Sequence, residues 1–119
     1  MSTVKIEENV ASVKARIAAA AGGRHVTLVA ATKMNDAEAV RRAIAAGVDA
    51  CGENRVQELE VKAPVLPQDI EWHLIGHLQS NKAAKAVEHA SWIHSVDSVK
   101  LLSLIEKAAE KRNKTMNIL

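Results

Sequence analysis

Short apolar runs alternate with longer amphipathic segments along this chain of 119 residues. In the longer segments apolar side chains recur every three or four positions, which predicts helices over residues 4–20, 35–47, 53–62, 80–90 and 98–111. The apolar runs are typical of strands buried on both faces, and they cover residues 26–32, 48–52, 72–76, 92–96 and 116–119. Helix and strand are therefore expected to alternate throughout.

Turn-forming and capping residues mark the expected helix boundaries. A glycine pair follows the first helix and Gly47 ends the second. Asn35, with Glu38 three residues later, resembles a capping box at the start of that second helix. Asp97 or Ser98 suits the N-cap of the last one.

Strands that are apolar on both faces and separated by helices imply a parallel sheet with right-handed crossovers. Two architectures satisfy that order, a doubly wound sheet and a (β/α) barrel. Both bind ligands at the carboxyl ends of their strands. Neither a GxGxxG nor a GxxxxGK[ST] motif occurs in the chain, which disfavours dinucleotide binding.

Composition narrows the class of protein further. With 48% hydrophobic and 25% charged residues the chain resembles one ordinary globular domain. Its 16 basic and 14 acidic residues are interleaved, so neither a nucleic-acid surface nor a polybasic membrane anchor is expected. The first residues lack the apolar stretch of a signal peptide or spanning helix. The lone cysteine, Cys51, cannot form an internal disulfide, which favours a reducing, cytoplasmic setting and a role as a small core residue.

Polar residues follow the ends of the expected strands, where a parallel sheet binds its ligands. They are Lys33 after the first strand, Glu53 and Asn54 after the second, His77 after the third, and Ser95 and Asp97 after the fourth. Partial desolvation of Lys33 would favour its neutral amine, a nucleophile toward aldehydes. A solvated lysine at the start of a helix is the alternative, and spacing alone does not separate the two.

The stretch CGENRVQE, residues 51–58, has two interpretations. Gly52 permits a tight turn, and the Asn54 amide can both donate to and accept from a ligand. Alternatively Glu53 and Asn54 begin a helix, the first facing the helix dipole and the second capping it.

The stretch WHLIGHLQSNK, residues 72–82, places His73 and His77 four positions apart. On a helix this pair could chelate zinc, but the intervening residues are typical of strand and turn, and no third ligand is suitably spaced. A metal site is therefore not expected. The loop residues His77, Ser80, Asn81 and Lys82 are instead available to a bound anion or a partner.

Taken in order, TLVAATK, GENRVQE and WHLIGHLQSNK resemble the motifs of the pyridoxal phosphate homeostasis protein family, whose members resemble the N-terminal barrel domain of alanine racemase. The resemblance runs from about residue 10 to residue 119. It implies an α/β fold, a parallel (β/α) barrel of the alanine racemase N-terminal type. Such barrels have eight strands and about 250 residues. Residues 1–119 are thus expected to be a single N-terminal portion, about half of the barrel, truncated at the fifth strand.

The resemblance also implies a cofactor site. Pyridoxal 5′-phosphate would be held as an internal aldimine by the lysine after the first strand, here Lys33, with Asn54, Ile75, His77 and Ser95 around the ring. Proline is frequent in the family at the position of His77, a difference that affects loop stiffness more than chemistry. The family's phosphate-binding loops lie in the second half of the barrel, so cofactor binding by this chain alone is expected to be weak or absent.

The implied function is binding, buffering and delivery of pyridoxal phosphate to recipient enzymes. Efficient catalysis is not expected, because racemases of this type use a tyrosine as the opposing base and the chain contains none. One alternative is a racemase-type enzyme acting on amino acids. Another is a non-catalytic half-barrel that associates with itself through the open sheet edge at residues 116–119.

Overall fold

Five short parallel strands form one sheet in a computed structural model that describes residues 5–33 and 35–119. The strands lie side by side in chain order, from β1 to β5. Each is paired in parallel with the next along the chain. Their bounds are β1 Val29–Ala31, β2 Ala50–Glu53, β3 Glu71–Leu74, β4 Trp92–Ile93 and β5 Asn117–Ile118.

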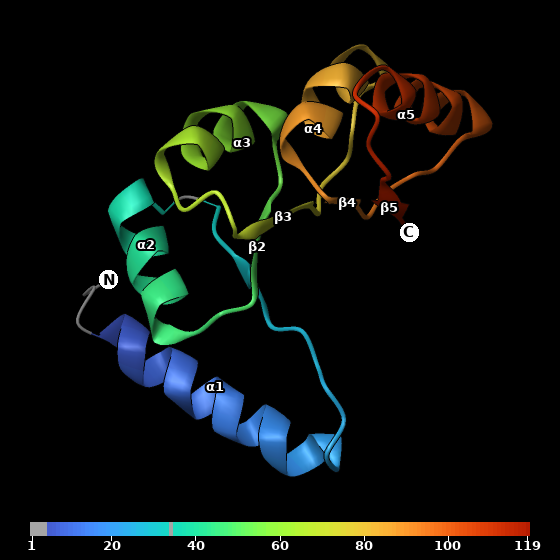
Figure 1. The fold of residues 1–119 in the computed structure, drawn as a ribbon. Coiled ribbons are helices and arrows are strands. Elements are labelled where there is room, and N and C mark those ends of the chain that lie inside the picture. Colours follow the sequence, from blue (N-terminus) through green and yellow to red (C-terminus); the bar gives the residue numbers. More distant parts are fainter. Residues whose placement is uncertain (1–4, 34) are drawn as a thin grey trace.

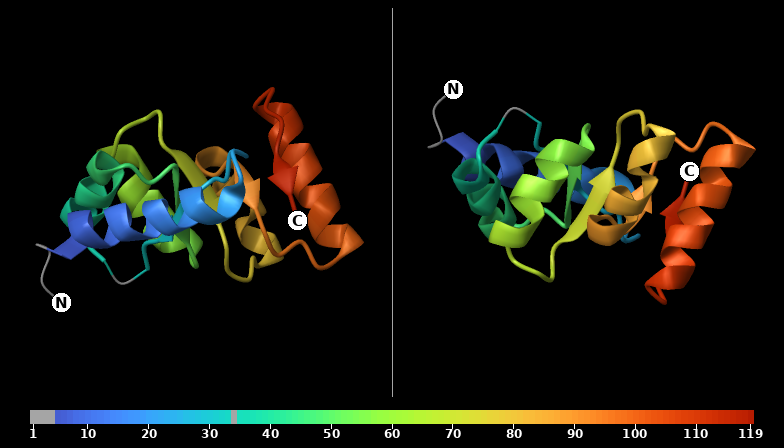
Figure 2. Two further views of the ribbon diagram at one scale, coloured as in Figure 1. Left: turned by 90° about the horizontal axis from the view of Figure 1, so that it is seen from below. Right: turned by 90° about the horizontal axis from the view of Figure 1, so that it is seen from above.

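The helices alternate with these strands as the apolar periodicity predicts. They are α1 Lys5–Ala21, α2 Ala37–Ala46, α3 Val56–Lys62, α4 Ala83–His89 and α5 Val99–Lys111, with 3-10 turns at Ala63–Val65 and Ser80–Lys82. Helices α2 to α5 follow one another along one side of the sheet (Figure 1), and α1 packs against α2. Views from below and above place α1 and α5 at opposite ends of the molecule (Figure 2).

Alternation along the strands sends the apolar side chains toward these helices. Cys51 is paired with Trp72, and Leu74 with Ile93. All four are buried, the first pair in a core cluster with Val40 and Leu59 and the second in a cluster with residues of α4 and α5. The other face of the sheet carries Gly52, His73 and Trp92, which face one another through the same register.

Several predicted strand bounds are wrong. The first strand begins at Val29 rather than residue 26, because pairing starts only where the Leu28 carbonyl accepts from the Asp49 and Ala50 N–H groups. The second begins two residues later than predicted and extends to Glu53. The last is shorter than predicted, and both residues of β5 are exposed rather than buried.

Two predicted helix starts are also wrong. The N-cap of α2 is Asp36, whose carboxylate accepts from the Ala39 N–H at 2.9 Å, and not Asn35. Helix α3 begins only at Val56, so Asn54 does not cap it and Glu53 is not in its first turn. At α5 the hydroxyl of Ser98 accepts from the Leu101 N–H, which selects Ser98 over Asp97. The predicted start of the first helix at residue 4 lies outside the described residues.

Candidate functional site

Lys33 lies just beyond the carboxyl end of β1, next to a firmly anchored residue. Thr32 is buried, its N–H donates to the Gly52 carbonyl at 2.9 Å, and its hydroxyl donates to the same carbonyl at 3.2 Å. The Lys33 side chain itself is exposed, so of the two alternatives left open by the sequence the structure shows the solvated lysine. Its amine is therefore accessible to a ligand arriving at this edge of the sheet.

Asn54 and Ile75 follow the ends of β2 and β3, where two glycines permit close contact. A Cβ on Gly52 would lie 3.2 Å from two methyl carbons of Ile75, which places the Ile75 side chain over that glycine. A Cβ on Gly76 would lie 2.4 Å from the carbonyl oxygen of Asn54. The turns that carry Asn54 and Ile75 are thus packed backbone against backbone.

His77 and Ser95 occupy different surroundings at the same edge. The hydroxyl of Ser95 donates to the Gly76 carbonyl, which ties the end of β4 to the end of β3. The imidazole of His77 is exposed, with Nδ1 3.8 Å from Oδ2 of Asp97. Ser95 is therefore tied to its neighbour, whereas His77 projects into solvent beside Asp97.

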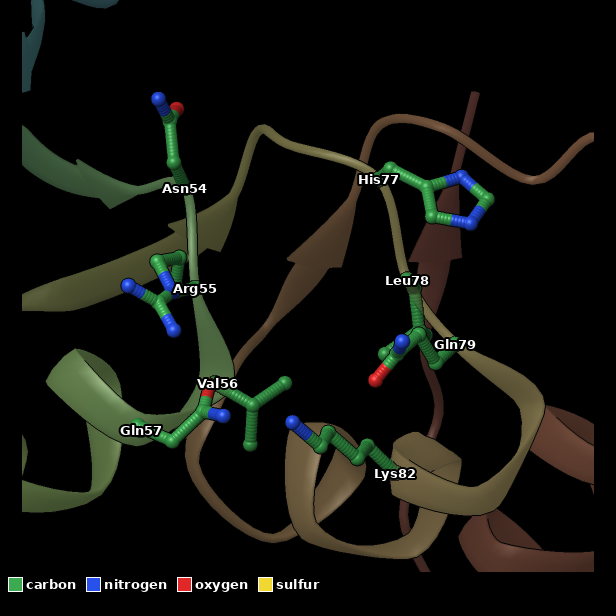
Figure 3. Close-up of a pocket in the computed structure, with 8 residues that line it drawn as sticks. All are labelled: Asn54, Arg55, Val56, Gln57, His77, Leu78, Gln79 and Lys82. Atoms are coloured by element: carbon green, nitrogen blue, oxygen red, sulfur yellow. The ribbon is translucent and has the colours of Figure 1, made fainter.

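A cleft of about 250 Å³ opens between the loops that follow β2 and β3 (Figure 3). It brings Asn54 and His77 together, but Lys33, Ile75 and Ser95 do not line it. Its cations are Arg55 and Lys82, and the side chains around it also include Val56, Gln57, Leu78 and Gln79. Because cations and amides line it without a carboxylate, the cleft is suited to an anionic group.

The burial of Glu53 was not predicted from the sequence. This residue forms a polar cluster with Lys62 and with Thr32, the residue before Lys33. It is fully buried, and Oε2 accepts from Nζ of Lys62 at 2.8 Å and from the Thr32 hydroxyl. Burial raises the pKa of the Glu53 carboxyl, and a hydrogen bond with Glu58 raises it further. Hydrogen bonds from Lys62 and Thr32 lower that pKa and so offset part of the rise. The hydrogen bond between Glu53 and Glu58 lowers the pKa of Glu58. The only signal in the sequence was a lysine nine residues after a glutamate.

A second polar cluster lies on the sheet face that points away from α2 to α5. Nδ1 of His73 lies 2.9 Å from Nε2 of His94, and Nε2 of His73 lies 2.7 Å from Oε1 of Glu71. Trp92 stacks on His73 with ring centroids 5.6 Å apart. Burial lowers the pKa of His94, as does the charge of His73. Among the described residues no group of three potential ligands is arranged to hold a metal ion.

Cys51 is confirmed as a small core residue. It is fully buried, and burial is the main cause that raises its pKa to about 11. A thiol held in its protonated form inside the core is a poor nucleophile. It takes no part in the candidate site.

These features define a class of protein: a parallel α/β fold of the (β/α)-barrel type, with reactive side chains gathered at the carboxyl edge of the sheet. The chain belongs to the family of the alanine racemase N-terminal domain, whose pattern it matches over residues 2–119. The predicted fold class is thereby confirmed.

Relatives make the comparison more specific. The chain is 48% identical over 107 residues to the pyridoxal phosphate homeostasis protein of Pseudomonas aeruginosa, covering 85% of this chain and 46% of that one. It is 36% identical to the protein of the same name from Escherichia coli over 123 aligned positions, covering 96% and 53%. The chain therefore spans about half the length of the curated relatives it matches.

Solved structures of similar proteins have the same fold as this chain. PipY of Synechococcus elongatus without pyridoxal phosphate superposes with a TM-score of 0.85 at 43% identity, covering 95% of this chain and 51% of PipY. PipY with pyridoxal phosphate bound superposes with a TM-score of 0.78 at 41% identity, covering 95% and 52%. The resemblance inferred from the three motifs is confirmed by these matches. In the described part of the chain, no helix has the length and apolar character needed to cross a membrane.

Proposed function

We propose that residues 1–119 form the N-terminal portion of a pyridoxal phosphate-binding protein that holds the cofactor and supplies it to recipient enzymes. The observation that carries this proposal is the place of Lys33, an exposed amine at the carboxyl end of β1 in a chain whose relatives are pyridoxal phosphate homeostasis proteins. The lone buried thiol, Cys51, supports the cytoplasm as the compartment.

The residues present suit the cofactor in kind. When bound, pyridoxal phosphate supplies an aldehyde carbon that a lysine amine attacks with loss of water. Lys33 would provide that amine, with Asn54, Ile75, His77 and Ser95 as its neighbours at the same sheet edge. Arg55 and Lys82, the cations that line the cleft, are the groups of this chain best suited to a phosphate.

Storage and delivery, rather than turnover of amino acids, is the activity that this set of side chains supports. Racemisation needs a second proton-transferring group on the opposite face of the substrate. The chain contains no tyrosine, and His77 is an exposed imidazole at this edge of the sheet. Sustained exchange of the amino-acid α-proton in deuterated water would favour the racemase alternative over storage.

The test is selective labelling of Lys33. The chain is mixed with pyridoxal phosphate, reduced with borohydride and digested, and the mass increment on each lysine is measured. Lys33 is expected to be labelled well ahead of the other lysines even if binding is weak, and Lys33→Ala is expected to abolish the preferred label. Lys85→Ala, which removes an exposed lysine from α4, is the matched control and should change nothing at Lys33. Equal labelling of all exposed lysines would refute the proposal.

Self-association through the sheet edge is a second candidate. It is favoured by the exposure of β5 and the residue after it, since Ile118 and Leu119 are 38% and 66% exposed and the edge of a sheet can pair with another chain. Sedimentation at increasing concentration tests it, because a monomer at every concentration excludes this candidate.

A further inference from the structure

The residue before Lys33 has every polar group engaged, and two of its partners are charged and buried. The N–H and hydroxyl of Thr32 donate to the Gly52 carbonyl, and the hydroxyl also reaches Glu53. The Thr32 carbonyl accepts from Nζ of Lys62 at 2.9 Å. Lys62 therefore bridges the end of β1 and the end of β2 with a single ammonium group.

An ion pair in this position is unusual because burial of charge is costly. The side chains of Lys62 and Glu53 are 9% and 0% exposed. Desolvating both ions offsets much of their attraction, and well-packed apolar residues of similar volume are often as stable. Net stabilisation is thus a weak reason for the pair, and its geometry suggests a positional role.

The second carboxylate oxygen of Glu53, Oε1, also argues against net stabilisation as the reason for the pair. If both carboxyl groups were ionised, Oε1 would be buried without a donor among the described residues. The two carboxyl groups also interact, since a hydrogen bond between them raises the pKa of Glu53 and lowers the pKa of Glu58. The Lys62 ammonium nevertheless joins the Thr32 carbonyl and Oε2 of Glu53 through bonds of 2.9 and 2.8 Å, and a connected network of this kind restricts the positions of its members.

We propose that Glu53 and Lys62 are positioning residues, which hold the Thr32 backbone so that the Lys33 amine is presented at the carboxyl edge of the sheet in one orientation. This inference rests on the proposed function of Lys33. Neither residue touches the bound ligand in this scheme. They act through Thr32, since Lys62 binds the carbonyl of the peptide unit that leads into Lys33.

The test compares labelling rates inside one molecule. The rate of borohydride-trapped labelling by pyridoxal phosphate is measured at Lys33 and, as an internal reference, at the exposed Lys100 of α5. Lys62→Met and Glu53→Gln are expected to lower the ratio of the two rates by about tenfold or more, because small displacements of a reacting group are costly. Lys62→Arg, which keeps a cationic donor, is expected to restore part of it.

Two controls separate positioning from loss of stability. Leu59→Ala removes a fully buried side chain from the same helix and leaves the hydrogen bonds of Thr32 in place. Lys85→Met breaks an exposed ion pair with Glu60. Both should leave the ratio unchanged under conditions where the chain is folded. An unchanged ratio of the two labelling rates in folded Lys62→Met and Glu53→Gln would overturn the inference. If either variant fails to fold, the ratio is measured in Thr32→Val and Lys62→Arg instead, and an unchanged ratio in Thr32→Val would overturn it.

A second readout is independent of pyridoxal phosphate. After reductive methylation with ¹³C-formaldehyde, the Lys33 methyl resonance and the exchange rate of the Asn35 amide, which donates to the Thr32 carbonyl, report the local geometry. Both should change in Lys62→Met and not in Lys85→Met. If Lys33 is not labelled preferentially in the unaltered chain, the proposed function fails while this readout still tests the positioning.

Discussion

Gly76→Ala should disrupt the turn that carries Asn54. The added Cβ would lie 2.4 Å from the Asn54 carbonyl oxygen and 2.9 Å from its Cα. Both atoms belong to the backbone, so no side-chain rotation relieves the overlap. Asn54 is also tied to the sheet, because the backbone carbonyl of the preceding residue, Glu53, accepts from the Ile75 N–H at 2.9 Å. The overlap must therefore be relieved by separating the ends of β2 and β3.

The magnitude follows from the distances. Ordinary carbon contacts begin near 3.4 Å, so the backbone must move by about 1 Å. Overpacking costs about 1–3 kcal/mol, and a backbone clash of this size belongs at the upper end of that range. A loss of about 3 kcal/mol lowers the unfolding midpoint of a domain of this size by roughly 10 °C.

Gly52→Ala is the matched control. Its Cβ would lie 3.2 Å from Ile75 methyls and 3.3 Å from a methyl of Val29, and side chains can yield by a few tenths of an ångström. Urea unfolding followed by circular dichroism measures both variants. Gly76→Ala should lose at least about 1.5 kcal/mol more than Gly52→Ala, since methyl contacts relax more cheaply than backbone. Equal losses would show that the backbone contact between Gly76 and Asn54 does not limit this turn.

Three further predictions concern charge and capping. Lys62→Met should destabilise the chain by about 3 kcal/mol at neutral pH in urea unfolding, because Glu53 loses its buried cation, and a loss no larger than that of Lys85→Met would contradict this. Burial lowers the pKa of His94 in the folded chain, so as the pH falls the imidazole is protonated more readily in the unfolded chain than in the folded one. The free energy of unfolding should therefore keep its full value above about pH 6.5 and fall as the pH drops below it. The check is the urea unfolding midpoint measured across that pH range. The midpoint should depend less steeply on pH in His94→Gln, and an unchanged dependence refutes the prediction. Asp36→Ala should cost about 1 kcal/mol through loss of the α2 N-cap, whereas Asn35→Ala should cost much less, and the reverse order would restore Asn35 as the cap.

The alternation of helix and strand could be predicted because apolar periodicity is a local property. The ends of α1 and α2 follow from glycines, and the Ser98 cap follows from its position before an apolar helix. Strand ends were harder to place, because in a parallel sheet pairing with the neighbour decides where a strand begins. Val26 is apolar and yet 44% exposed, since β1 begins three residues later, at Val29, next to the Leu28 carbonyl that accepts from the Asp49 and Ala50 N–H groups.

The candidate site could be predicted only in part, for the same physical reason. Lys33, Asn54 and His77 follow strand ends, so the topology alone places them at one edge. Glu53 was expected either at the ligand edge or at a helix start, and its full burial was not predicted, because a carboxylate is seldom fully buried. Its burial depends on Lys62, nine residues later, and on Thr32, 21 residues earlier, and such contacts are visible only after the sheet and α3 are packed together.

The two polar clusters lie on opposite faces of one sheet, so changes in them are expected to affect different parts of the molecule. Glu53 points toward α3 and is linked to Lys33 through Thr32. His73 points the other way and is linked to Glu71, the first residue of β3, and to His94, which follows β4. In the described part of the chain no series of side-chain hydrogen bonds runs from His94 to Thr32, so protonation of His94 is expected to affect mainly the stability of the sheet. Disturbance of Glu53 or Lys62, in contrast, is expected to reach the Lys33 backbone directly, because the carbonyl that Lys62 binds belongs to the peptide unit that joins Thr32 to Lys33.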